Sequence, residues 1–228
     1  TTGRELLDLD NRTDRVAQES LVVANPDFNY GREMLGSTRS RSSASPYAIQ
    51  QRSGDLKSRY WQKLLGTRME GNAIAKLIDA KLLVEQQATA LAVQKQVAPK
   101  VLHLATHAYY LADQKKANTN EQRSQQSYSD NRARKNYLQI ENPLLRSGVV
   151  LAGANQPETN SKDDGYLTAL EVAKLDWLGT EMVVISACES GKGDIQFGEG
   201  VYGLKRAIAV AGARSSLLSL WQVADIGT

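Results

Sequence analysis

This chain of 228 residues has one cysteine, two histidines and a small net charge. Its single cysteine excludes a disulfide within the chain, which fits a reducing compartment such as the cytoplasm. The 28 basic and 25 acidic residues give a net charge of +3, and without a clustered patch this bias is too weak to indicate nucleic-acid binding. The most apolar stretch, residues 207–224, is interrupted by Arg214, so we expect no membrane span. These absences predict a cytoplasmic globular protein with neither nucleic acid nor membrane among its partners.

Short apolar runs and helical patterns alternate along the chain, whose hydrophobic content of 41% is enough for a core. Strands are predicted at residues 20–24, 82–84, 101–107, 182–187 and 215–221, and helices after residue 67 and at 88–96, 168–177 and 201–211. Strand, helix and strand in succession imply right-handed crossovers between parallel strands. The sequence therefore predicts an α/β fold with a mainly parallel central sheet.

Two stretches lack apolar periodicity and are predicted to be mobile loops within a single domain, residues 1–228. The first, at about 31–54, is rich in Ser, Arg and Gly; the second, at about 111–139, holds six basic and three acidic residues among Gln, Asn and Ser. The second stretch is either an ordinary solvated loop or a segment for self-cleavage or gating. The start at Thr-Thr-Gly and the abrupt stop after the last strand indicate a fragment of a longer protein.

Two helix starts are marked by the spacing Thr-x-x-Glu, at Thr67–Glu70 and Thr168–Glu171. In such a capping box the hydroxyl and the carboxylate each accept a hydrogen bond from a backbone N–H that the helix leaves unpaired. Gly212 follows the apolar face of the helix at 201–211, which is the position of a C-cap.

The only cysteine and one of the two histidines each stand where a predicted strand ends. Cys188 follows the apolar run 182–187 and precedes Glu-Ser-Gly, and His107 ends the run 101–107. If these strands are parallel and adjacent, both residues meet at the carboxyl edge of the sheet, where open α/β sheets place their active sites. His103 is predicted to be a core histidine that bonds to backbone.

A thiol attacks a carbonyl carbon as the thiolate, and a neighbouring imidazole supplies the base or ion-pair partner that makes it one. The alternative for Cys188 is a small buried hydrophobe, although its place at the strand exit argues against this. Two histidines and one cysteine are too few ligands for a closed zinc site, so neither metal nor cofactor is expected. His107 precedes Cys188 by 81 residues, or by 52 without the 29 residues of the second loop, and the histidine of caspases lies about 50 residues upstream of their cysteine.

Five separate motifs occur in the same order as in a known family. They are Val-Leu-His-Leu-Ala-Thr-His at 101–107, Asn-Pro-Leu-Leu-Arg-Ser-Gly at 142–148, Leu-Thr-Ala-Leu-Glu-Val-Ala-Lys-Leu at 167–175, Val-Ile-Ser-Ala-Cys-Glu-Ser-Gly at 184–191, and Gly-Glu-Gly-Val-Tyr-Gly-Leu-Lys-Arg at 198–206 leading to Ser-Leu-Trp at 219–221. Together they resemble a CHAT domain, the caspase-like domain often attached to tetratricopeptide repeats and named in part for the cyanobacterial protein HetF.

This resemblance implies a caspase-hemoglobinase fold, with helices on both faces of the sheet, and a place among the cysteine endopeptidases that include separase and metacaspases. It implies that His107 and Cys188 are the catalytic dyad and that the backbone N–H groups of Ala108 and Cys188 form the oxyanion hole. Ala108 stands where such proteins usually have glycine, which is tolerable if its φ is negative. The implied partners are protein or peptide substrates and a tetratricopeptide-repeat region of the same protein.

Two aspartates are candidates for a specificity pocket that binds a basic P1 side chain. Asp27 and Asp225 both follow predicted strand ends, and a carboxylate there could pair with arginine or lysine. The segment 221–225, Trp-Gln-Val-Ala-Asp, is similar to the Trp-x-Val-x-Asp segment of separase-like proteins. The alternative for each is a turn or helix cap.

Two other functions remain as rivals to a caspase-like cysteine endopeptidase. One is a catalytically silent CHAT domain that serves as an interaction module. The other is a nucleotide-binding domain, which lacks support because no glycine-rich phosphate loop follows the first predicted strand.

Overall fold

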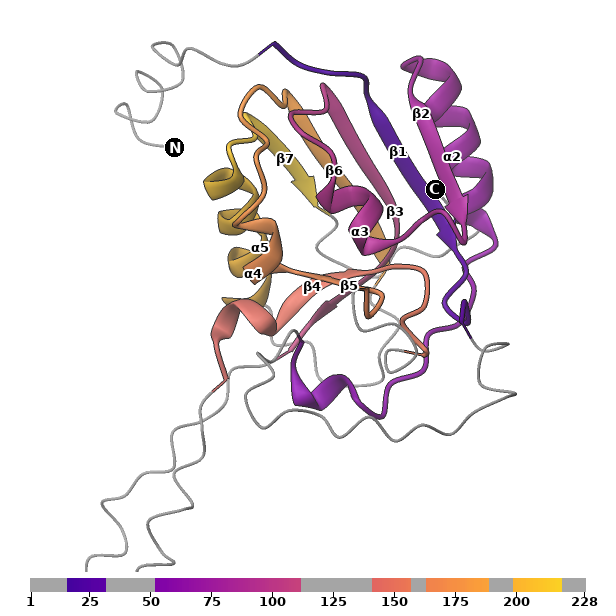
Figure 1. Ribbon diagram of the computed structural model, residues 1–228, viewed down its shortest axis with the longest axis vertical. Coiled ribbons are helices and arrows are strands. Elements are labelled where there is room, and N and C mark those ends of the chain that lie inside the picture. The colour runs from indigo at the N-terminus through magenta and orange to yellow at the C-terminus, as the bar shows by residue number, and fades with distance from the viewer. Residues whose placement is uncertain (1–15, 32–51, 112–140, 157–162, 189–198, 219–228) are drawn as a thin grey trace, which may run out of the picture.

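The computed structural model describes residues 16–31, 52–111, 141–156, 163–188 and 199–218, and at 188 and 199–201 it describes the backbone. In these ranges the chain forms one seven-stranded sheet with helices on both faces, as Figure 1 shows. The strands are β1 (Leu21–Pro26), β2 (Lys81–Glu85), β3 (Val101–Tyr110), β4 (Ser147–Val150), β5 (Tyr166–Thr168), β6 (Met182–Cys188) and β7 (Ser215–Leu218). The helices are α2 (Gly66–Leu77), α3 (Ala90–Gln94), α4 (Ala169–Val172) and α5 (Glu199–Ala211), with 3-10 turns η2 (Gly54–Leu56) and η4 (Pro143–Leu145).

Strand β3 is the centre of the sheet. It pairs in parallel with β1 on one side and with β6 on the other, while β2 and β7 extend the parallel part outward. Past the end of β1, the same side of β3 pairs antiparallel with β4, and β4 with β5. The mainly parallel α/β sheet predicted from the sequence is therefore confirmed, with an antiparallel pair added at one end.

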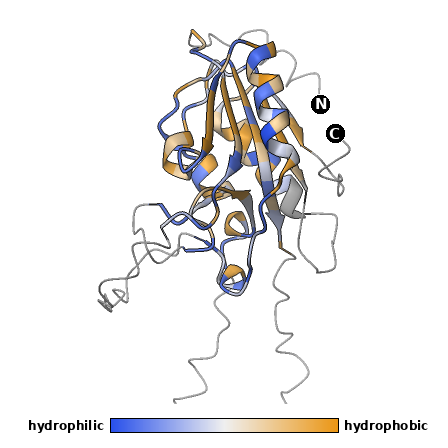
Figure 2. Ribbon diagram, turned by 90° about the vertical axis from the view of Figure 1, so that its right-hand side faces the viewer, coloured by the Kyte–Doolittle hydropathy of each residue, from blue (hydrophilic) through white to orange (hydrophobic). Residues whose placement is uncertain are grey.

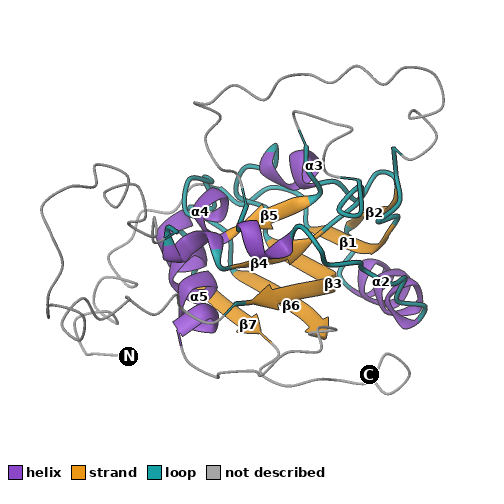
Figure 3. Ribbon diagram, turned by 90° about the horizontal axis from the view of Figure 1, so that it is seen from below, coloured by secondary structure: helices purple, strands orange, loops and turns teal. Residues whose placement is uncertain are grey.

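The two faces of the sheet are covered by different helices. Leu21 and Val23 of β1 belong to the larger core, to which α3, α4 and α5 also contribute side chains such as Val93 and Leu204. The alternate β1 residues Val22 and Ala24 face α2, which lies across the sheet from the other helices (Figure 3). Figure 2 shows the apolar colour concentrated in the strands, as expected for strands buried on both faces.

Several predicted boundaries need correction. Strand β3 continues to Tyr110, so His107 lies inside the strand and not at its tip, because β4 supplies new pairing partners beyond β1. Helix α4 ends at Val172 and not near Trp177. The last strand is described as far as Leu218, and the remainder of the predicted 215–221 strand lies outside the described residues.

Both predicted loops are shorter at one end than expected. Ser53 is fully buried, and its hydroxyl donates to Glu141 at 2.6 Å, so the end of the predicted 31–54 loop is fixed to the fold. Leu111 is also buried, and its N–H donates to the carbonyl of Arg146 at 2.7 Å. Residues 32–51 and 112–140, the bulk of both predicted loops, lie outside the described part.

No helix in the described ranges has the length and apolar character needed to cross a membrane.

Candidate functional site

The strands that carry the predicted dyad are adjacent and parallel. The pairing of β3 with β6 runs in unbroken register from Val101 opposite Met182 to His107 opposite Cys188. The condition under which the two residues meet, adjacent and parallel strands, is therefore fulfilled. Two residues that are 81 positions apart in the sequence have paired backbones at the end of this ladder.

The imidazole of His107 is fully buried and held on three sides. Its Nε2 lies 2.7 Å from the carbonyl oxygen of Gln62. The ring centroids of Phe28 and Trp61 lie 5.2 and 5.3 Å from its own, with the planes tilted by 36° and 38°. Because a carbonyl oxygen only accepts hydrogen bonds, Nε2 must carry a hydrogen. In the neutral ring, Nδ1 is then the basic nitrogen.

The residues around His107 come from three elements of the fold. Phe28 lies in the turn after β1, His107 is in β3, and Trp61 with Gln62 lies in the segment that leads into α2. The parallel sheet brings the first two together, because Val23 and Ala24 of β1 pair with Leu104 and Ala105 of β3. Trp61 is 2% exposed, so its ring is buried where it packs against His107.

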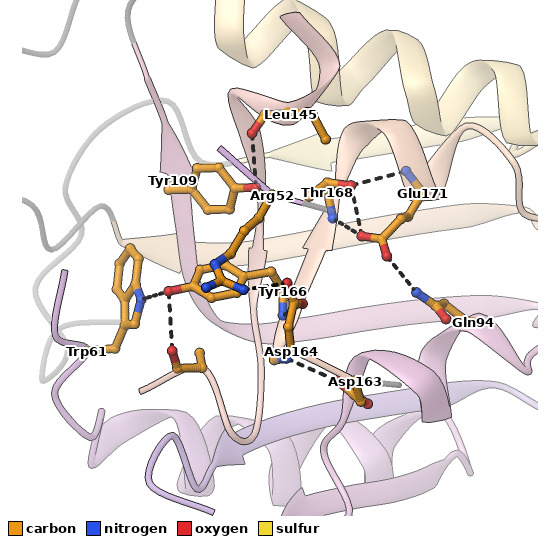
Figure 4. A network of polar contacts seen from close by, with 12 residues as sticks. Arg52, Trp61, Gln94, Tyr109, Leu145, Asp163, Asp164, Tyr166, Thr168 and Glu171 are labelled. Carbon is orange, nitrogen blue, oxygen red and sulfur yellow. Dashed lines mark hydrogen bonds and ion pairs between the residues drawn. The ribbon is translucent and has the colours of Figure 1, made fainter. Parts of the chain in front are cut away.

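A polar network holds Trp61 in place (Figure 4). Its Nε1–H donates to the hydroxyl of Tyr166 at 2.9 Å, and the Tyr166 ring packs edge-on against that of Tyr109, 5.9 Å between centroids. The guanidinium of Arg52 lies 5.6 Å from the centroid of the Tyr166 ring and pairs with Asp164 at 3.0 Å. This network joins the tip of β3 to β5 and to the segment before α2.

Burial governs the electrostatics of this network. Desolvation raises the pKa of the Asp164 carboxyl, while its hydrogen bond with Arg52 opposes that shift. Burial likewise raises the pKa of Tyr166, against the hydrogen bond from Trp61. The hydroxyl of Tyr166 therefore stays neutral at physiological pH and able to accept from Trp61.

The backbone of Ala108 has the negative φ that alanine needs at this position. It lies within β3, opposite Val149 of β4. The non-glycine residues with positive φ in the described ranges are Asn25, Asp79, Glu85 and Ala98, so Ala108 keeps the negative φ of a strand. Its side chain is buried in the larger core.

Asp27 lies beside the site and serves in a turn. Its Oδ1 accepts the N–H of Asn29 at 3.1 Å, and its carbonyl oxygen accepts the N–H groups of Tyr30 and Gly153, both at 3.0 Å. This is the turn role that was the alternative for Asp27. It also lines an open hollow of about 400 Å³, together with Val84, Glu85, Gln86 and Gln87.

The other predicted pocket residue, Asp225, lies outside the described residues.

His103 is a core histidine, but its partner is not backbone. It is 5% exposed, and its Nε2 lies 2.9 Å from the carboxylate of Glu70 on α2. The prediction that it bonds to backbone was therefore wrong. Glu70 had been expected to cap its own helix, and the strand beneath α2 provides a closer partner.

Sequence reasoning missed the residues that hold His107. The Gln62 contact is made by a backbone carbonyl, which no residue type reveals. Trp61 gave a usable signal, because it is one of only three tryptophans and stands in an otherwise polar stretch before a predicted helix.

Within the described residues, no three His, Cys, Asp or Glu side chains gather closely enough to hold a metal ion.

Comparison with protein families gives a match to the CHAT domain over residues 1–228, the whole chain. Comparison with curated proteins gives no match.

Proposed function

Because the chain belongs to the CHAT-domain family, whose members are related to caspase-like peptidases, we propose that it is a cysteine endopeptidase with Cys188 as nucleophile and His107 as base. The observation that carries this proposal is the register of β3 and β6, which pairs the backbones of His107 and Cys188. The chain has no second cysteine, so no other thiol competes for the role.

In this mechanism Nδ1 of His107 takes the proton of the Cys188 thiol, and the thiolate attacks the carbonyl carbon of the scissile peptide bond. The N–H groups of Ala108 and Cys188 stabilise the resulting oxyanion, and each such donor is worth about 10²- to 10³-fold in rate. The imidazolium then gives its proton to the nitrogen of the scissile bond, the C–N bond breaks, and the amine leaves while the acyl group stays on Cys188 as a thioester. Water, activated by the same imidazole, hydrolyses the thioester and regenerates the thiol.

The carbonyl of Gln62 supports this assignment of Nδ1. It accepts the hydrogen of Nε2 at 2.7 Å, which fixes the tautomer and the orientation of the ring, as an aspartate does in other hydrolytic triads. When His107 becomes positively charged, the same carbonyl dipole stabilises the charge. Because burial by itself disfavours a charged ring, this hydrogen bond offsets part of that cost.

The proposed substrates are proteins or peptides, cut after arginine or lysine. Asp27 at the end of β1 and Asp225 are the proposed acids of the P1 pocket. Asp27 adjoins Phe28, whose ring packs against His107, which puts its backbone next to the proposed reaction centre. A cytoplasmic setting and a tetratricopeptide-repeat region as partner belong to the same proposal.

A second candidate function is a catalytically silent CHAT domain that binds a partner. The full burial of His107 favours it, because a base that receives no solvent or substrate performs no catalysis. The two functions differ in the reactivity of the Cys188 thiol.

A panel of fluorogenic peptides that differ at P1 tests the proposed function. We expect the wild type to cleave after arginine or lysine, and Cys188→Ala to lose all cleavage. Ser186→Ala, a similar change two residues earlier in β6, is the matched control and keeps the activity. Cleavage that survives Cys188→Ala overturns the mechanism. Preference for small P1 residues overturns only the acidic pocket.

A further inference from the structure

Asn155 connects two of the segments that surround His107. Its backbone N–H donates to the carbonyl of Phe28 at 2.9 Å. Its side-chain Oδ1 accepts the N–H of Trp61 at 2.8 Å, and its Nδ2 donates to the carbonyl of Trp61 at 3.0 Å. The same Nδ2 donates to Oδ1 of Asn29 at 3.1 Å. A single residue, in the turn that follows β4, is thus bonded both to the turn after β1 and to the segment before α2.

These segments provide the immediate contacts of the imidazole. Phe28 and Trp61 supply the rings at 5.2 and 5.3 Å, and the residue after Trp61 supplies the carbonyl at 2.7 Å from Nε2. A shift of the Trp61 backbone would carry the Gln62 carbonyl with it. Asn155 therefore acts on His107 through the residues that it bonds.

The side-chain amide is suited to this work because it has both an acceptor and two donors. The N–H and the C=O of Trp61 are both paired with the Asn155 side chain, much as in a pair of bonded strands. The second hydrogen of Nδ2 goes to Asn29. A carboxylate at this position would keep the acceptor, lose both donors and face two oxygens.

We propose that Asn155 is a positioning residue for His107: it fixes the Trp61–Gln62 backbone, so that the Gln62 carbonyl holds the imidazole with the hydrogen on Nε2. The catalytic part of this proposal rests on the proposed function. The structural part, that Asn155 sets the tautomer and the orientation of His107, does not depend on activity.

The test compares Asn155→Asp with Asn72→Asp in the 228-residue chain. Asn72 is exposed on α2, so its variant adds the same charge away from the site. The chain has two histidines, so long-range proton–nitrogen NMR spectra of histidine-labelled protein resolve the tautomer of each. We expect the His107 signals of Asn155→Asp to move away from the Nε2–H pattern, while those of His103 stay unchanged. Asn72→Asp should match the wild type.

Activity provides the second readout. Misplacement of a base lowers kcat by about 10²-fold, and we expect this in Asn155→Asp with KM unchanged within about twofold, since substrate contacts persist. Unchanged His107 signals and unchanged kcat in this variant overturn the proposal. If the wild type cleaves no peptide, the proposed function fails, and the NMR comparison still decides the role of Asn155.

Hydrogen exchange in the wild type keeps the proposal testable if Asn155→Asp does not fold. The amide of Trp61 should be protected, because its hydrogen is bonded to the Asn155 side chain. A milder variant, Asn155→Ser, should lose that protection and show the same change in the His107 signals. A Trp61 amide that exchanges freely in the wild type contradicts the proposal.

Discussion

At the scale of single residues, the two histidines of β3 show how neighbours decide chemistry. His103 and His107 are four positions apart, so they share one face of the strand, and both are buried. His103 meets the carboxylate of Glu70, with 2.9 Å between its Nε2 and the carboxylate oxygen. His107 meets a neutral carbonyl and two aromatic rings, so one face of the strand offers an anionic partner to one histidine and a neutral partner to the other.

Glu171 offers a test of the electrostatics of the buried network. Its carboxylate accepts from the N–H and the hydroxyl of Thr168, at 2.9 and 2.8 Å, and from Gln94 at 3.2 Å, as Figure 4 shows. Burial raises its pKa from the ordinary value of 4.5, against these hydrogen bonds. The folded state thus binds this proton more tightly than the unfolded state does, and stability falls as pH rises through that interval.

We predict that Glu171→Gln removes this fall in stability with rising pH. The free energy of unfolding of the wild type, minus that of the variant, should decrease as pH rises from about 4.5 to the raised pKa, and then level off. Urea unfolding at a series of pH values measures it, and the other titrating groups cancel in the difference. Glu181→Gln, at an exposed site, controls for the loss of a charge. A wild type that gains on Glu171→Gln over this interval would contradict the assignment.

At the scale of elements, one sequence pattern gave two different results. Thr168 caps α4 as predicted, with both halves of the capping box formed. The same spacing at Thr67 forms no box: α2 begins at Gly66, and the Thr67 hydroxyl donates to the carbonyl of Leu64 at 2.8 Å. Thr168 is the last residue of β5 and has extended backbone, whereas Leu65 before α2 is already helical. A capping box needs the extended residue as well as the side chains.

The packing of α2 on the sheet depends on Gly71. A methyl group there would overlap the Cβ of Ala24 in β1, so the helix would have to move away from the strand. Alanine gains about 1 kcal/mol of helix propensity over glycine, and overpacking costs about 1–3 kcal/mol.

We predict that Gly71→Ala is destabilised, by up to about 2 kcal/mol net, when urea unfolding is compared with the wild type. Asn72→Ala, exposed on the same helix, should gain up to about 0.5 kcal/mol. A Gly71→Ala protein as stable as Asn72→Ala would mean that α2 does not pack as described.

At the scale of the whole molecule, the sequence was sufficient for the five parallel strands of the sheet, whereas the antiparallel strands β4 and β5 were not predicted. Buried runs that end in polar residues, joined by helical patterns, leave few topologies open. The continuation of β3 to Tyr110 was not predictable, because it depends on pairing with β4 from beyond a long insertion. The same holds for Gln62 and Asn155, whose roles arise from backbone groups and tertiary contacts.

The most direct test of the proposal that His107 activates Cys188 is the rate at which iodoacetamide alkylates Cys188, measured from pH 5 to 9. With one cysteine in the chain, the modified residue is known. An unperturbed thiol is only a few per cent ionised at pH 7, so we predict that the wild type reacts at least about tenfold faster there than His107→Gln. His103→Gln, the other histidine of β3, should stay within about twofold of the wild type. Equal rates in the wild type and His107→Gln, with the pH profile of an ordinary thiol, would contradict the pairing of His107 with Cys188.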